Sequence, residues 1–96
     1  MILFAGHDPG AKNHVRPIYD RAIALGESAL FLDLAAYREL MDLPIATKFV
    51  SDTNPTLLVS GISIDSGETA LFSACKSIGI PTIALIDLSA KGSFFE

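Results

Sequence analysis

The stretch that decides the fold is residues 1–33, MILFAGHDPGAKNHVRPIYDRAIALGESALFLD. It opens with a continuous apolar run that Gly6 closes, which is typical of a strand buried on both faces of a sheet. After a polar loop over residues 6–13, apolar side chains recur from residue 15 to residue 25 with the spacing of one helix face. A second short apolar run, residues 29–32, follows. Strand, helix and strand in this order predict a parallel βαβ unit.

The rest of the chain repeats this alternation. Three further apolar runs have the length of strands: residues 47–50 (a weak edge strand), 56–60 and 81–86. Two further stretches have helical spacing: residues 34–43, which stop before Pro44, and residues 68–78, which stop at Gly79. The start of the last helix, residues 65–68, has the form of a capping box, which by itself accounts for Asp65 and Glu68. We therefore predict one α/β domain over residues 1–96, a three-layer Rossmann-like fold with a mostly parallel five-stranded sheet.

Composition excludes several classes of protein. The chain has 96 residues, half of them hydrophobic, and its 7 basic and 11 acidic side chains give a net charge of −4. We expect no nucleic-acid partner, because sequence-independent binding needs clustered cations. No run approaches the ~20 apolar residues that cross a bilayer, and the apolar start lacks the basic flank of a signal peptide, so a cytoplasmic location is expected. Cys75 is the single cysteine and is best interpreted as a small core residue.

Candidate site residues gather after the strands, because open parallel sheets bind ligands beyond the carboxyl ends of their strands. The candidate ligand-binding residues follow the first and fourth expected strands: Gly6, His7, Asp8, Gly10 and Asn13, then Ser60, Gly61, Ser63 and Asp65. Asp87 follows the last strand and is the most site-like carboxylate. If the first strand is central, the first two of these loops flank a single crevice.

None of the common phosphate or nucleophile motifs is present. The spacing of Gly6, Gly10 and Lys12 fits neither a P-loop nor the pattern G-x-G-x-x-G. Residues 61–65, GISID, do not form the G-x-S-x-G elbow of hydrolases. The two glycines are equally explained by a sharp turn, and Lys12 by a solvated helix face. We expect no cofactor, and no metal site, because the two histidines and Asp8 lack the strict ligand spacing of such a site.

The two histidines, His7 and His14, are the candidate bases. Near a helix N-terminus the protonated imidazole is disfavoured, which suits a group that accepts a proton from a hydroxyl. We predict that His14 stands at the N-terminus of the first helix, faces the crevice and is the general base, oriented by one carboxylate among Asp8, Asp65 and Asp87. A structural or exposed role remains open for His14 and is favoured for His7.

A family resemblance rests on the run His14-Val15-Arg16-Pro17, which follows a strand and a glycine-bearing loop. It resembles the H-x-x-P step near the start of GT-B-type glycosyltransferases and UDP-N-acetylglucosamine 2-epimerases. Residues 8–14 and 79–87 are similar to a prokaryotic group of such proteins. The resemblance implies the N-terminal, acceptor-side domain of a two-domain nucleotide-sugar enzyme. It also implies that His14 is the base, with Asp65 or Asp87 as its orienting carboxylate.

The sequence ends at Glu96, before the second domain that the resemblance implies, so glycosyl transfer by this chain alone is not expected. The expected partner is a C-terminal domain or a second copy that covers the apolar surface near Phe94 and Phe95. The expected ligand is a sugar or a nucleotide sugar. The alternative is a stand-alone α/β module that binds a small molecule or regulates, without catalysis. A small hydrolase that pairs His14 with an aspartate ranks below both.

Overall fold

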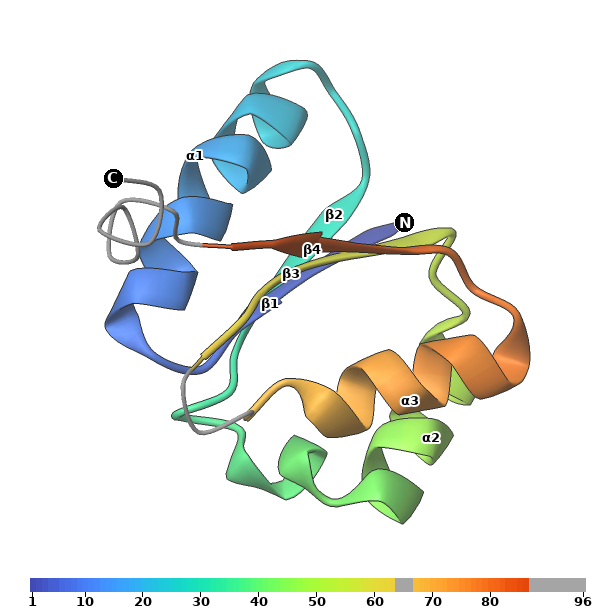
Figure 1. Ribbon diagram of the computed structural model, residues 1–96. Helices are drawn as coiled ribbons and strands as arrows, with labels where there is room; N and C mark the ends of the chain where they lie inside the picture. The colour runs from blue at the N-terminus through green and yellow to red at the C-terminus, as the bar shows by residue number, and fades with distance from the viewer. Residues whose placement is uncertain (64–66, 87–96) are drawn as a thin grey trace, which may run out of the picture.

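The computed structural model describes residues 1–63 and 67–86 and has an α/β fold (Figure 1). Its elements in chain order are β1 (Ile2–Gly6), α1 (Pro9–Ala24), β2 (Ala29–Asp33), the 3-10 helix η1 (Arg38–Met41), α2 (Leu43–Thr53), β3 (Leu57–Gly61), α3 (Thr69–Ile78) and β4 (Thr82–Leu85). Within the described residues, four strands form one parallel sheet in the order β2-β1-β3-β4. The predicted parallel α/β architecture is therefore confirmed, with four strands where five were expected.

Helices cover both faces of the sheet (Figure 1). α1 lies on one face, over a buried cluster that contains Phe4 and Val15. α2 and α3 lie together on the other face, over a larger cluster that contains Leu3 and Leu71. The strand order explains this division, because the chain leaves β1 toward β2 and later returns past β1 to β3. Right-handed crossovers in opposite directions place their helices on opposite faces of the sheet.

The predicted strand at residues 47–50 is wrong, because this stretch lies within α2. The Asp42 carboxylate caps the helix by accepting a hydrogen bond from the Ile45 N–H. Pro44 lies in the first turn, where its missing N–H costs nothing, so it begins this helix instead of ending the one before. Ala46 and Val50 are both fully buried and four residues apart, so they lie on one helix face. The predicted helix over residues 34–43 is reduced to a turn and η1.

The first helix begins earlier than predicted. α1 starts at Pro9, inside the stretch expected to be a loop, and Pro17 lies within it. Proline fits the first helical position because its fixed φ is already helical. His14 is consequently the sixth residue of α1 and lies beyond its first turn.

The predicted capping box is also incorrect. Glu68 itself occupies the N-cap position of α3, and its side chain makes no capping hydrogen bond. The carboxylate turns toward the end of the sheet instead, where it has three donors. Gly79 ends α3 in a left-handed conformation, as its place in the sequence predicts. None of the helices in the described ranges combines the length and the apolar character that a bilayer crossing needs.

Candidate functional site

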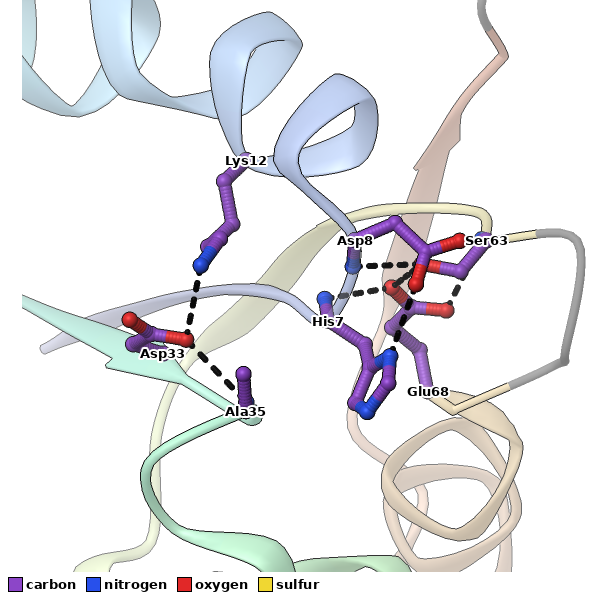
Figure 2. A network of polar contacts seen from close by, with 7 residues as sticks. All are labelled: His7, Asp8, Lys12, Asp33, Ala35, Ser63 and Glu68. Atoms are coloured by element: carbon purple, nitrogen blue, oxygen red, sulfur yellow. Dashed lines mark hydrogen bonds and ion pairs between the residues drawn. The ribbon is translucent and has the colours of Figure 1, made fainter.

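The candidate site lies where β1 and β3 end side by side. These strands pair in parallel, so their carboxyl ends meet at one edge of the sheet. β1 leads into α1 on one face, and β3 leads toward α3 on the other (Figure 1). Such a point, at which the chain diverges to both faces, leaves a crevice that binds ligands in open α/β sheets. Figure 2 shows that His7 and Asp8, after β1, meet Ser63 and Glu68 there.

A buried carboxylate joins the two loops. Glu68 is only 2% exposed, and its Oε2 accepts hydrogen bonds from the His7 N–H at 2.7 Å and from the Ser63 hydroxyl at 2.6 Å. Its Oε1 accepts the Ser63 N–H at 3.0 Å. The Ser63 Oγ in turn accepts the Asp8 N–H at 3.0 Å. We call Glu68, Ser63 and the backbone N–H groups of His7 and Asp8 the loop clamp. Because the bonds to the His7 and Asp8 N–H groups cross from one loop to the other, the clamp fixes the backbone of both loops.

The clamp presents a histidine–aspartate pair. His7 Nδ1 lies 2.8 Å from Asp8 Oδ1, and the two side chains are 17% and 34% exposed. A carboxylate only accepts hydrogen bonds, so Nδ1 is the donor in this contact. The ring packs against Gly67, where a Cβ atom would lie 2.6 Å from His7 Cγ. Asp8 and the backbone at residue 67 therefore fix the orientation of the imidazole.

The pairing with His7 leaves α1 without a side-chain cap. Asp8 is the N-cap residue of α1, yet its side chain makes no capping hydrogen bond, and the first turn contains no acidic residue. Pro9 follows directly and has no N–H to satisfy. Within the described residues, neither Asp8 nor an acidic residue of the first turn caps the positive end of the helix dipole, which lies beside the histidine–aspartate pair. This is a favourable environment for an anionic group.

An ion pair borders the site on the side of β2. Lys12 Nζ lies 3.1 Å from Asp33 Oδ1, and the same oxygen accepts the Ala35 N–H at 3.0 Å (Figure 2). The hydrogen bond from Lys12 holds the pKa of Asp33 below its ordinary value, and the bonds from nearby backbone amides act in the same direction, against partial burial. Lys12 is therefore not simply part of a solvated face. Asp33 was missed among the candidates, although it ends a strand just as Asp87 was expected to.

Two candidates from the end of β3 serve the packing of the sheet. Ser60 is fully buried, and its hydroxyl lies within hydrogen-bond distance of two backbone oxygens, Ala5 O at 3.1 Å and Gly61 O at 2.9 Å. At Gly61, a Cβ atom would lie 2.7 Å from Ala11 Cβ. The glycine therefore lets the first turn of α1 approach β3. Neither residue belongs to the network of Figure 2.

The other candidate residues lie at the end of β1, along α1 or outside the residues that the structure describes. Gly6 is buried at the end of β1, and both Gly10 and Asn13 are exposed on α1. His14 is half-buried. An α-helix turns 100° per residue, so His14 lies on the flank of α1 opposite Lys12. Lys12 faces β2, where it pairs with Asp33. His14 is therefore on the side of β3 and β4, outside the loop clamp. The predictions for Asp65, Asp87, Phe94 and Phe95 fall outside the described residues.

Two further results concern metal binding and similarity to known proteins. Across residues 1–63 and 67–86, no three side chains of His, Cys, Asp or Glu come together as a metal site. Comparisons with protein-family models, with curated proteins and with solved structures found no match to this chain. Function is therefore inferred from the geometry of the site.

Proposed function

We propose that this chain is a Rossmann-like, acceptor-side domain of a nucleotide-sugar enzyme, which binds a hydroxylated sugar ligand at the carboxyl ends of β1 and β3. The observation that carries the proposal is the His7–Asp8 pair at 2.8 Å, presented at the divergence of β1 and β3. An imidazole oriented by a carboxylate is the usual arrangement of a general base. The resemblance of residues 14–17 to the H-x-x-P step supports the same class.

In the proposed step, His7 Nε2 takes the proton of a ligand hydroxyl. The O–H bond of the ligand breaks, an N–H bond forms on Nε2, and the oxygen becomes the nucleophile. Asp8, already bonded to Nδ1, stabilises the imidazolium that results. The base in this proposal is His7, because the Asp8 carboxylate orients its ring and the loop clamp fixes its backbone. His14 provides the matched comparison on the other flank of α1.

The surroundings fit a ligand with both an anionic group and hydroxyls. The uncapped start of α1 favours the anion, as phosphate-binding helix termini do. Asp33 is 42% exposed and remains able to accept a hydrogen bond from a sugar hydroxyl beside its bond to Lys12. Nucleotide sugars and sugar phosphates combine these groups.

A second candidate is the stand-alone binding module without catalysis. It is favoured by one observation: the loop clamp that shapes the site is built from this chain alone. In that case the site holds its ligand, while His7 contributes a hydrogen bond and no proton transfer.

The first test is nitrogen NMR of the two imidazoles in the whole chain. We expect the neutral ring of His7 to carry its proton on Nδ1, and Asp8→Asn to change that tautomer preference. A His7 ring protonated on Nε2 at neutral pH contradicts the role as base. Titration with UDP-N-acetylglucosamine, UDP and N-acetylglucosamine then tests binding, read from backbone amide shifts.

We expect shifts at residues 6–12, Asp33 and Ser63, and His7→Ala is expected to weaken binding more than His14→Ala. Equal losses in both variants, or shifts confined to other parts of the chain, contradict the assigned site. Binding that survives in His7→Gln, together with the expected tautomer in the unsubstituted chain, favours the module without catalysis. Gln keeps a hydrogen bond but accepts no proton.

A further inference from the structure

β2 has an open edge. Among the described strands, β2 pairs only with β1. Two bonds fix which of its residues face β1: the Ile2 N–H donates to Ser28 O, and the Leu34 N–H donates to Gly6 O. In a parallel ladder, alternate residues of a strand bond to the same neighbour, so the even-numbered residues of β2 face β1. The N–H and C=O groups of Ala29 and Phe31 therefore point away from the sheet.

Two hollows lie along this edge. One of about 280 Å³ is lined by three consecutive residues of β2 and by side chains of η1, α2 and the turn between β2 and η1: Leu30, Phe31, Leu32, Tyr37, Glu39, Leu40 and Phe49. The second, about 540 Å³, shares Glu39, Leu40 and Phe49 with the first and continues along α2 to Ile45 and Lys48. Leu30 and Tyr37 are 39% and 51% exposed. The open backbone groups thus run beside apolar hollows of side-chain size.

β2 itself carries none of the usual protections of an edge strand, although the Arg16 guanidinium on α1 lies 5.5 Å from the centre of the Phe31 ring. Soluble proteins commonly protect exposed strands with lysine, proline or a bulge. β2 has the sequence ALFLD, in which the one charged residue is the last. Asp33 is engaged with Lys12, and its carbonyl accepts the N–H groups of Ala36 and Tyr37. The open segment is consequently the apolar part, from Ala29 to Leu32, which is suited to pairing with another strand.

Charge selects the kind of partner. Glu39 borders both hollows, whereas the lysine in the larger one is 3.0 Å from Asp52 and already paired. The chain as a whole has a net charge of −4. A second copy paired antiparallel through β2 brings together two chains that each have a net charge of −4, which is unfavourable. A basic partner is complementary to this edge.

We propose that the β2 edge binds an extended peptide segment of another protein, in which apolar residues alternate with basic ones. Its backbone pairs with Ala29 and Phe31, one apolar side chain enters the hollow beside Leu30 and Tyr37, and a lysine or arginine meets Glu39. Main-chain hydrogen bonds supply affinity in this mode of recognition, and side-chain pockets supply specificity. The proposal is independent of the proposed function, because the open edge of β2 and the loop clamp use different residues.

The test uses a short blocked peptide that alternates leucine with lysine, titrated into the isotope-labelled chain. At about ten times the dissociation constant, hydrogen exchange of the Ala29 and Phe31 amides is expected to slow about tenfold. The amides of Leu30 and Leu32, which face β1, are expected to change little. A peptide with a central proline lacks one backbone donor, and a peptide with glutamate in place of lysine has the wrong charge. Both are expected to bind more weakly.

Variants of the protein complete the test. Glu39→Gln is expected to weaken the lysine peptide about threefold, as the loss of an exposed ion pair does. Lys76→Gln, a one-charge change at an exposed position of α3, is the control with no effect. Equal binding of the lysine and glutamate peptides overturns the proposal. Hydrogen exchange that slows at other amides but not at those of Ala29 and Phe31 also overturns the proposal. Protection of these two amides without peptide, in proportion to protein concentration, overturns it in favour of a second copy.

Discussion

At the scale of single residues, Glu68 determines the shape of the candidate site. Its carboxylate is buried and has three donors on two oxygens, so each oxygen is an acceptor. Hydrogen bonds to a charged group stabilise a fold more than neutral ones, and an unsatisfied buried group is costly. The connection between the loops after β1 and β3 therefore depends on one side chain, which bonds to the backbone of His7 and to Ser63.

We expect Glu68→Gln to reduce the free energy of unfolding by about 1–3 kcal/mol. Whichever way the amide is turned, its NH₂ group faces a backbone donor, the N–H of Ser63 or of His7. Urea unfolding followed by circular dichroism measures the loss. Glu27→Gln, at an exposed position, is the control and is expected to stay within about 0.5 kcal/mol of the unsubstituted chain. Equal stabilities of the two variants contradict the loop clamp.

The lowered pKa of Asp33 makes the stability of the folded chain depend on pH in a definite direction. Its pKa in the folded chain is lowered from the ordinary value of 3.8, chiefly by the hydrogen bond from Lys12. The stabilisation is present above that ordinary value and is lost as the pH falls through the folded-state pKa. We expect the coupling between Asp33→Asn and Lys12→Met in a double-mutant cycle to be measurable at pH 7 and to decrease as the pH falls below 3.8. It stays below about 1 kcal/mol because both side chains are partly exposed. A coupling that grows in acid contradicts this assignment.

At the scale of elements, apolar runs predicted the strands well and helix boundaries poorly. β1, β2, β3 and β4 lie within one residue of the expected strands, because each contains a continuous apolar run, although only β1 and β3 are buried along most of their length. α2 was missed because Phe49-Val50 beside Thr47 suits a strand by local preference. Its caps decided otherwise: Asp42 and Pro44 start a helix, and Asn54 ends it. Short apolar runs are ambiguous until the flanking residues are read as caps.

Asn54 offers a direct test of that helix end. It has φ 46° and ψ 58°, the left-handed region, and its N–H donates to Val50 O at 2.8 Å. Asn54→Ala is expected to destabilise the chain by about 1 kcal/mol, because alanine has the same crowding of Cβ against the following carbonyl as asparagine but lacks the short polar side chain that compensates for it. Asn54→Gly is expected to stay within about 0.5 kcal/mol, because glycine adopts it without that strain. Denaturant unfolding of both variants provides the measurement. An alanine variant as stable as the glycine variant contradicts the left-handed cap.

At the scale of the whole molecule, the sequence predicted that the loops after β1 and β3 lie together and not how they are joined. The rule that ligands bind at strand ends placed His7, Asp8 and Ser63 among the candidates without any motif. It did not predict that Glu68 joins them. The bonds that do so link residues separated by 61, 55 and 5 positions, and strand order and register bring them together. Local spacing also favoured His14, because the H-x-x-P run suggested that the first helix starts near His14. In the structure this helix starts at Pro9.

Cys75 tests whether the larger core opens as one unit. It is fully buried in the cluster under α2 and α3, and burial raises the pKa of its thiol. Both effects suppress the thiolate that reacts with labelling reagents. We expect labelling of the folded chain to be at least ~10³ slower than that of the unfolded chain, since reaction requires opening of the core.

The dependence of that labelling rate on urea identifies the opening event. If α2, α3 and the sheet separate only on global unfolding, the logarithm of the rate rises with the slope of equilibrium unfolding. The double variant Ser73→Cys, Cys75→Ala places a thiol at an exposed position of α3 and is expected to react at once in water. A shallow slope for Cys75 means that α3 leaves the sheet by itself, which contradicts a single cooperative core. Such a result also means that the Glu68 contacts at the start of α3 are made and broken within the folded chain, since the helix and its N-cap residue move together.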